Sequence, residues 1–145
     1  MITISLCMIV KDEEEVLERA LKSVEGIADE IIIVDTGSTD QTKKIALKYT
    51  DKVYDFVWCD DFAKARNYSF SKATMDYCMW LDADDIISEE NREDLINLKK
   101  TLSNDTSVVM LKYNAEFDHN NKPTFTYYRE RLLRRKDNFK WEGFI

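Results

Sequence analysis

The sequence predicts a three-layer α/β domain built around a mostly parallel mixed sheet. Strand-like apolar segments alternate with segments of helical spacing in the order βαβαβαβαββ, which is typical of parallel sheets joined by right-handed crossovers. Residues 31–34 are apolar at every position, as expected of a strand covered by helices on both faces. With 145 residues, three glycines and one proline, the chain suits one domain of mostly regular structure over residues 1–145.

The first elements are a strand, a helix and a second strand. Residues 2–10 are apolar and rich in β-branched side chains, which favours a buried strand. The acidic run 11–15 is expected to open a helix that Asp12 caps, because carboxylates stabilise a helix N-terminus. Gly26 is expected to end this helix, and residues 30–34 then form the second buried strand.

The next elements are two helices on either side of a short strand. Ser38 and Gln41 fit a capping box that starts the second helix. Residues 52–57 predict the third strand, and Asp60 or Asp61 can cap the third helix. Five residues of that third segment are expected to share its apolar side: Phe62, Ala65, Ser69, Phe70 and Ala73.

The last elements are a strand, a helix and a pair of strands. Residues 76–81 predict an apolar strand that ends in carboxylates, and a helix is expected from Ser88 to about Leu102. Residues 106–114 and 124–134 alternate enough to form two further strands. A basic cluster at the end of the chain is interpreted as a solvated strand face. It comprises Arg129, Arg131, Arg134, Arg135, Lys136 and Lys140.

Composition argues against several classes of function. The net charge of −7 makes a nucleic-acid backbone an unsuitable main partner. No apolar stretch approaches the roughly 20 residues that a membrane helix needs, so we expect no transmembrane segment. Cys7, Cys59 and Cys78 lie far apart in apolar or aromatic surroundings, which fits reduced, mostly buried thiols in a cytoplasmic protein. His119 is the only histidine, which argues against a zinc site.

The most informative segment is residues 79–85, where an apolar run ends in three carboxylates. If the strand carries on into them, Asp82 and Asp84 face the same spot, because alternate strand residues point to one side. Two like charges held together are costly unless a positive group lies between them. The obvious candidate is a divalent cation bound through oxygen ligands.

Carboxylates also follow the first two strands, at residues 12–13 and at Asp35. Because ligands of open α/β sheets bind at the carboxyl ends of strands, we expect these groups to meet in one cleft. The sequence has no glycine-rich phosphate loop of the GxGxxG or GxxxxGK[ST] type. The acidic rim therefore suits a nucleotide whose phosphates are bridged by a metal, with Asp35 as an acceptor for a ring N–H or a hydroxyl group.

Four segments, in this order and at this spacing, resemble the family 2 glycosyltransferases. They are Ser5–Glu14, Ile33–Asp40, Ala65–Asn67 and Trp80–Asp85. The resemblance runs from residue 2 to about residue 90 and continues more weakly to the end of the chain. It implies the GT-A fold and a metal-dependent, inverting enzyme. Such an enzyme moves a sugar from a nucleotide-diphosphate sugar, with a UDP-sugar favoured, to an unknown glycan, lipid or protein acceptor.

The resemblance also implies roles for individual residues. Asp84, in a DXD motif with Asp82, would be catalytic because it would hold Mn²⁺ or Mg²⁺ at the diphosphate. Asp82 would contact the ribose or metal-bound water, and Arg66 would help with the phosphates or position Asp82. The nucleotide-sugar site would comprise Ile9, Val10, Lys11, Glu13, Asp35, Arg66 and Asp82.

The chain departs from the family pattern in three places, one of which is Lys11-Asp12, where a Tyr-Asn pair is frequent. Thr36 stands where many relatives carry a second aspartate, and no residue matches the general base firmly. Glu142 and Glu130 are the candidates for the carboxylate that deprotonates the acceptor. Because relatives often continue beyond this region into a His-Glu pair, and because the chain ends on an aromatic and apolar stretch, we expect a fragment of a longer protein.

Other interpretations stay open on the sequence alone. A nucleotidyltransferase also uses a metal on a nucleotide, although it would want a glycine-rich basic loop after the first strand. The chain could also be a non-catalytic nucleotide-binding fragment or an interaction module. At single positions, Asp35 can bond the amide of Gly37 or Ser38 in a turn, and Arg66 can pair with an aspartate at the start of its own helix.

Overall fold

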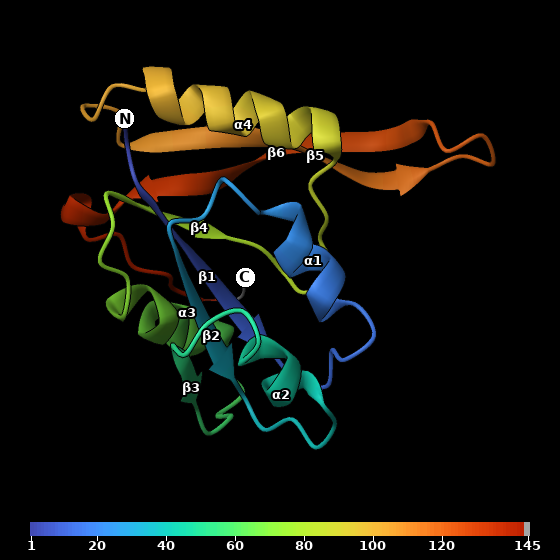
Figure 1. The fold of residues 1–145 in the computed structure, drawn as a ribbon, viewed down its shortest axis with the longest axis vertical. Helices are drawn as coiled ribbons and strands as arrows, with labels where there is room; N and C mark the ends of the chain where they lie inside the picture. The colour runs from blue at the N-terminus through green and yellow to red at the C-terminus, as the bar shows by residue number, and fades with distance from the viewer. Residues whose placement is uncertain (144–145) are drawn as a thin grey trace.

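The computed structural model describes residues 1–143, in which six strands form one mixed sheet in the order β3-β2-β1-β4-β6-β5 (Figure 1). The strands are β1 (Ile4–Val10), β2 (Glu30–Asp35), β3 (Val53–Asp55), β4 (Tyr77–Trp80), β5 (Val108–Phe117) and β6 (Pro123–Arg134). The pairs β1–β2, β1–β4 and β2–β3 are parallel, and the pairs β4–β6 and β5–β6 are antiparallel. The predicted mostly parallel mixed sheet is confirmed.

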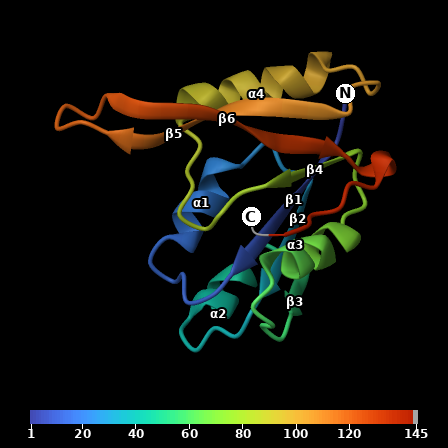
Figure 2. The same cartoon turned by 180° about the vertical axis from the view of Figure 1, so that it is seen from behind.

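Helices cover both faces of this sheet, which gives the three layers that the sequence predicts. They are α1 (Leu17–Ser23), α2 (Thr42–Ala46), α3 (Phe62–Ser71) and α4 (Glu89–Thr101), with a short 3₁₀ helix η1 (Arg135–Asp137) after β6. The two opposite views show α1 and α2 on one face and α3 on the other, with α4 lying along the β5–β6 hairpin (Figures 1 and 2). Among residues 1–143, no helix combines the length and the apolar character required to cross a membrane.

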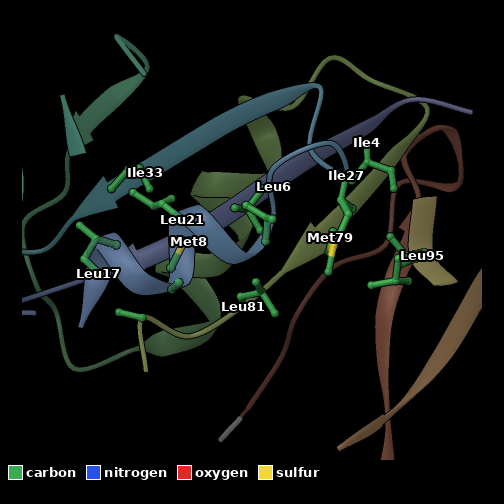
Figure 3. Close-up of a cluster of buried hydrophobic side chains, with 14 of the residues drawn as sticks. Ile4, Leu6, Met8, Leu17, Leu21, Ile27, Ile33, Met79, Leu81 and Leu95 are labelled. Atoms are coloured by element: carbon green, nitrogen blue, oxygen red, sulfur yellow. The ribbon is translucent and has the colours of Figure 1, made fainter. Parts of the chain in front are cut away.

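The strand β1 lies in the middle of the sheet and sends alternate side chains to its two faces. Ile4, Leu6 and Met8 point into the main core, which also contains Leu17 of α1 and Leu95 of α4 (Figure 3). Fully burying an aliphatic side chain of this size stabilises the fold by about 1.5–3 kcal/mol. This core holds the carboxyl ends of β1, β2 and β4 in place.

A smaller apolar cluster lies on the opposite face of the sheet. Cys7 and Cys78, from neighbouring strands, pack there with Ile32 and Ala73. Both thiols are free and buried, as the sequence predicts. The third thiol, Cys59, is exposed and lies in the loop between β3 and α3.

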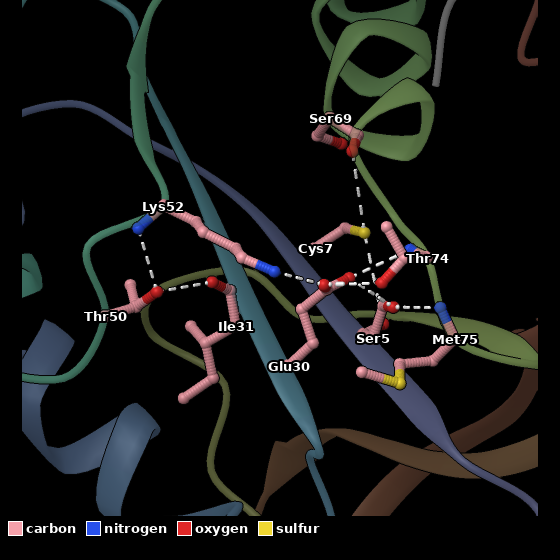
Figure 4. Close-up of polar contacts among 9 residues, drawn as sticks. All are labelled: Ser5, Cys7, Glu30, Ile31, Thr50, Lys52, Ser69, Thr74 and Met75. Atoms are coloured by element: carbon pink, nitrogen blue, oxygen red, sulfur yellow. Dashed lines mark hydrogen bonds and ion pairs between the residues drawn. The ribbon is translucent and has the colours of Figure 1, made fainter.

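A buried polar network occupies the end of the sheet opposite the carboxyl ends of β1 and β2 (Figure 4). The side chain of Glu30 is 2% exposed, pairs with Lys52, and accepts hydrogen bonds from the Ser5 hydroxyl at 2.8 Å and the Thr74 amide at 2.9 Å. Burial alone would raise the pKa of Glu30, but the bonds from Lys52, Thr74 and Ser5 outweigh it and lower the pKa to about 2. The network joins β1 and β2 to the segments before β3 and β4.

The helix α1 begins at Leu17, so the prediction that the acidic run 11–15 opens it is wrong. Asp12 has a left-handed backbone with φ of 51° and does not cap the helix. Its Oδ1 instead accepts a hydrogen bond from the Thr39 amide at 2.8 Å, and Glu14 accepts one from the Gln41 amide at 3.0 Å. The acidic segment therefore bonds the loop before α2, because that loop offers free amides that lie close in space.

The predicted capping box at the start of α2 is also wrong. The helix begins at Thr42, and no side chain of Gln41 caps it. Ser38 uses its hydroxyl to accept a hydrogen bond from the Asp12 amide at 2.9 Å. The amide of Thr42 donates to Asp40 at 2.9 Å, so an aspartate that precedes the helix satisfies its first turn.

Two other predicted caps are confirmed. Asp61 accepts a hydrogen bond from the Lys64 amide at 3.2 Å at the start of α3, and Ser88 accepts one from the Asn91 amide at 3.2 Å at the start of α4. Phe62, expected on the apolar side of this segment, is 52% exposed. That exposure leaves Phe62 free to line a cavity beside α3.

Candidate active site

A cavity of about 430 Å³ opens at the carboxyl ends of β1, β2 and β4. This is the edge of the sheet where the sequence predicts a ligand cleft. Its lining combines carboxylates, cations and aromatic rings. The lining residues are Ile9, Val10, Lys11, Glu13, Thr36, Trp58, Phe62, Arg66, Trp80, Asp82, Ala83, Asp84 and Arg129.

Seven of the nine predicted site residues line this one cavity. They are Ile9, Val10, Lys11, Glu13, Arg66, Asp82 and Asp84. The other two, Asp35 and Glu142, are not among the lining residues. The structure thus brings together three segments that lie far apart in the sequence, namely the end of β1, the helix α3 and the turn after β4.

The carboxylates after β4 lie in a turn and not in a strand, because β4 ends at Trp80. The amide of Asp85 donates a hydrogen bond to the carbonyl oxygen of Asp82 at 3.0 Å, which closes the turn. The expectation that strand alternation aligns the two aspartates is therefore wrong. Asp82 and Asp84 nevertheless line the same cavity, with Ala83 between them.

Arg66 supplies a cation next to these carboxylates. Its Nη2 lies 3.7 Å from Oδ1 of Asp82, and its side chain is only 11% exposed. The guanidinium carbon lies 4.1 Å from the ring centre of Trp80 and 4.9 Å from that of Trp141. Burial lowers the pKa of Arg66, and the charge of Asp82 opposes this shift. The ion pair of Arg66 is thus with Asp82 in the cleft.

The acidic groups of the cleft perturb one another. Burial raises the pKa of Asp82, and the charge of Asp85 raises it further, whereas Arg66 opposes the shift. Burial also raises the pKa of Glu13, and the negative charges of Asp84 and Asp82 raise it further. Carboxylates that repel one another in this way favour the approach of a positive charge.

The donor set at this site suits a cation that is shared with a ligand. Asp82 and Asp84 both line the cavity and offer two carboxylates. Within residues 1–143, no three potential ligand side chains of the Asp, Glu, His or Cys type come together at a metal-binding distance. Mg²⁺ is commonly held by one or two carboxylates together with substrate phosphates and water, so this pair fits such an ion.

Asp35 is 4% exposed and lies directly before Thr36, which lines the cavity. Its Oδ1 accepts hydrogen bonds from the amides of Gly37 at 2.9 Å and Ser38 at 2.8 Å. The turn interpretation therefore holds for one oxygen. The other oxygen, Oδ2, is buried and has no hydrogen-bond partner in the described part of the chain. A buried acceptor without a partner is costly and calls for an explanation.

Sequence reasoning missed the contribution of β6 to the cavity. Arg129 lines the cavity and Arg131 is buried, so the interpretation of this part of the basic cluster as a solvated face is wrong. Their guanidinium carbons lie 5.0 Å and 3.9 Å from the ring centre of Trp80. Their spacing indicates only that the two arginines share one face of the strand, because residues two apart do so, and not that this face is buried.

The predicted general bases lie outside the cavity lining. Glu142 is exposed, and its neighbour Trp141 is held by Asn67 of α3. Glu130 pairs with Arg129 at 3.3 Å, and its carbonyl oxygen accepts a hydrogen bond from the indole of Trp80. Among the glutamates, Glu13 lines the cavity.

This chain matches only part of the length of two curated relatives. The chain is 48% identical over 85 residues to the TPR repeat-containing protein Synpcc7942_0270 of Synechococcus elongatus, a match that covers 59% of this chain and 21% of that protein. It is 35% identical over 92 residues to the uncharacterized glycosyltransferase RT0209 of Rickettsia typhi, with 63% of this chain and 31% of that protein covered. The chain thus spans a fifth to a third of these relatives.

Solved structures with the same fold include two that hold a nucleotide. TarS of S. aureus in complex with UDP matches with a TM-score of 0.56 and 26% identity, over 66% of this chain and 31% of that one. Glucosyl-3-phosphoglycerate synthase from Mycobacterium tuberculosis in complex with Mg²⁺ and UDP matches with a TM-score of 0.51 and 25% identity, over 59% and 34%. Both matches support the GT-A fold.

The family model described as Glycosyl transferase family 2 matches residues 5–144, which is nearly the whole chain. This match covers the end of β1, α3 and the carboxylate turn, which together form the cavity. The chain therefore has the GT-A fold and belongs to glycosyl transferase family 2.

Proposed function

We propose that this chain is the donor-binding domain of a longer glycosyltransferase that uses a nucleotide-diphosphate sugar, with a UDP-sugar favoured. The sugar would pass to a glycan, lipid or protein acceptor with inversion, in the presence of Mn²⁺ or Mg²⁺. The observation that carries this proposal is the placement of Asp82 and Asp84 beside Arg66 on the wall of one cavity. Family membership and the UDP complexes of TarS and glucosyl-3-phosphoglycerate synthase support it.

The phosphate end of the donor would lie at the carboxylate turn. Asp84, together with Asp82, would hold the cation, and Arg66 and Arg129, which line the same cavity, would bind the diphosphate. When bound, a divalent cation supplies the charge that neutralises the leaving nucleoside diphosphate. The guanidinium groups add donors whose geometry suits phosphate oxygens.

The nucleoside end would lie against the ends of β1 and β2. Ile9, Val10, Lys11 and Thr36 line this part of the cavity. Asp35 precedes Thr36 in the sequence, its buried Oδ2 has no hydrogen-bond partner in the described part of the chain, and such an acceptor would suit the ring N–H of a base. Occupation of Oδ2 by a ligand donor would also remove the cost of leaving it without a partner.

Inversion requires the acceptor hydroxyl to attack the anomeric carbon from the face opposite the diphosphate, after a carboxylate takes its proton. Glu142 remains a prediction for this base. It follows Trp141, whose ring packs near Arg66, so this segment lies beside the phosphate end of the cleft. Glu13 is a further carboxylate at the cavity, and its raised pKa is typical of groups at functional sites.

Calorimetric titration with UDP and with GDP, with and without Mn²⁺, tests the proposal directly. We expect UDP to bind the wild-type chain more than tenfold more tightly with Mn²⁺ than without it. Asp84→Asn should abolish this gain because it removes a charged ligand of the cation. Asp94→Asn serves as a matched control, since Asp94 is an exposed aspartate on α4. If neither nucleotide binds under any metal condition, the proposed function is wrong.

A further inference from the structure

Asp85 closes the turn that carries the two cleft carboxylates. It is 8% exposed and is not among the residues that line the cavity. Its Oδ2 accepts a hydrogen bond from the amide of Asp82 at 3.0 Å, and its own amide donates to the carbonyl oxygen of Asp82 at 3.0 Å. These reciprocal bonds fix the backbone on either side of Asp84.

Arg131 of β6 anchors this turn to the sheet. Its Nη1 lies 3.2 Å from Oδ2 of Asp85 and 3.1 Å from the carbonyl oxygen of Trp80, the last residue of β4. Both side chains of the Arg131–Asp85 pair are only 7% exposed. The guanidinium carbon also lies 3.9 Å from the ring centre of Trp80 and 5.2 Å from that of Tyr113 on β5. One side chain thus joins the end of β4, the turn and the β5–β6 hairpin.

A buried ion pair is weak evidence for stability, because desolvation of the two charges offsets much of their attraction. An apolar pair of similar size would fill the same space. The specific effect of Arg131 and Asp85 is geometric, because the bonds of Asp85 Oδ2 to the amide of Asp82 and to Arg131 fix where the turn lies relative to β6. Partners that hold metal ligands in place usually affect metal affinity by 10- to 100-fold.

We propose that Asp85 and Arg131 are positioning residues that set the geometry of the cation site formed by Asp82 and Asp84. Neither residue touches the cation or the nucleotide, and each acts through the backbone of the turn. This inference rests on the proposed function, in which Asp82 and Asp84 hold the cation. It adds that Arg131 of β6, about 50 positions away in the sequence from the end of β4, affects how tightly Asp82 and Asp84 hold the cation.

The experiment measures Mn²⁺ affinity by electron paramagnetic resonance titration, with Mn²⁺ alone and with UDP present, together with unfolding by urea. We expect Asp85→Asn and Arg131→Met each to lower Mn²⁺ affinity 10- to 100-fold, and Arg131→Lys to lower it less because it keeps the charge. UDP affinity without metal should stay unchanged. Glu30→Gln is the control, since it alters a buried ion pair at the far end of the sheet and should cost stability without changing Mn²⁺ affinity.

A double variant, Asp85→Asn with Arg131→Met, separates positioning from a purely structural role. It leaves no buried charge without its partner, so its stability should recover relative to the single variants. Its Mn²⁺ affinity should remain as low as in the single variants. Recovery of Mn²⁺ affinity together with stability, or affinities within twofold of wild type in all variants, would overturn the inference. If the wild-type chain binds Mn²⁺ but no nucleotide, the proposed function is refuted and the inference about Asp85 and Arg131 is not. If it binds neither Mn²⁺ nor a nucleotide, both the proposed function and this inference are overturned.

Discussion

Arg66 places a positive charge on the cleft wall between two indole rings. Its guanidinium carbon lies 4.1 Å from the ring centre of Trp80 and 4.9 Å from that of Trp141. Its Nε is buried and has no hydrogen-bond partner in the described part of the chain. A planar guanidinium can stack on aromatic faces and still present several donors, which a lysine ammonium cannot do. We therefore expect the site to require the shape of arginine as well as its charge.

Arg66→Lys should weaken the binding of UDP in the presence of Mn²⁺ by about tenfold, or roughly 1.4 kcal/mol. The reason is that a lysine loses the stacking on both rings and reaches Asp82 with a more strongly hydrated group. Calorimetric titration checks this, with Arg92→Lys on α4 as the matched control, since Arg92 pairs with Glu89 and neither residue lines the cavity. Equal affinities for wild type and Arg66→Lys would contradict the assignment of Arg66 to the phosphates.

Single residues of the site were predictable where their signal was local. Asp82, Asp84 and Arg66 belong to short motifs beside recognisable elements, and all three line the cavity. Arg129 and Arg131 were not predictable in this way, because their position depends on the antiparallel pairing of β6 with β4. That pairing joins segments about 50 residues apart, and the alternation within β6 alone does not say which face is buried.

At the scale of elements, α3 is tied to the segment that follows η1. The side-chain amide of Asn67 donates to the carbonyl oxygen of Trp141 at 2.9 Å, and the amide of Trp141 donates to Oδ1 of Asn67 at 2.7 Å. This pair of bonds holds the ring of Trp141 near Arg66 and Phe70. The conformation of a terminal segment thus contributes to the environment of the cleft.

Asn67→Asp should destabilise the fold by about 1–3 kcal/mol, because a second acceptor oxygen replaces the donor that faces the Trp141 carbonyl. The Trp141 amide should also exchange its hydrogen at least tenfold faster. Urea denaturation and amide hydrogen exchange measure the two effects. Asn97→Asp on the exposed side of α4 should change neither. Unaltered exchange at Trp141 in Asn67→Asp would show that the segment is held by packing alone.

The boundaries of elements were predictable from capping only where the cap is local. Asp61 and Ser88 cap the helices that follow them, three residues before the amides that they bind. Asp12 and Ser38 also have the composition of caps, but their partners lie about 26 residues away, in each other's loops. A side chain that accepts a hydrogen bond from an amide of another loop does not cap the helix that follows it. A local sequence pattern does not reveal such a distant partner.

At the scale of the whole molecule, the sheet separates a ligand cavity from a stabilising network. The carboxylates of the cavity repel one another at the carboxyl ends of the strands, and the pKa values of Glu13 and Asp82 are raised there. At the opposite end, Glu30 is surrounded by donors and its pKa is lowered to about 2. Repulsion between like charges at the cavity is thus accompanied by a fully satisfied carboxylate elsewhere in the same sheet.

The lowered pKa of Glu30 predicts how the stability of the chain depends on pH. A carboxyl group whose folded pKa lies below its unfolded value stabilises the fold above the unfolded pKa, and the contribution is lost as pH falls through the folded pKa. With a folded pKa of about 2 against an ordinary value of 4.5, Glu30 should contribute roughly 3 kcal/mol at pH 7. That contribution should decline between about pH 5 and pH 2.

Glu30→Gln isolates this contribution, because it keeps the shape of the side chain and removes its charge. At pH 7 we expect it to lower the free energy of unfolding by about 2–3 kcal/mol, since Lys52, Ser5 and Thr74 lose their charged acceptor. At pH 2.5 most of the difference from wild type should vanish, because the wild-type carboxyl group is then close to its own protonation. Urea denaturation at both pH values measures the change. A difference that stays constant with pH would mean that packing around residue 30, and not its charge, provides the stability.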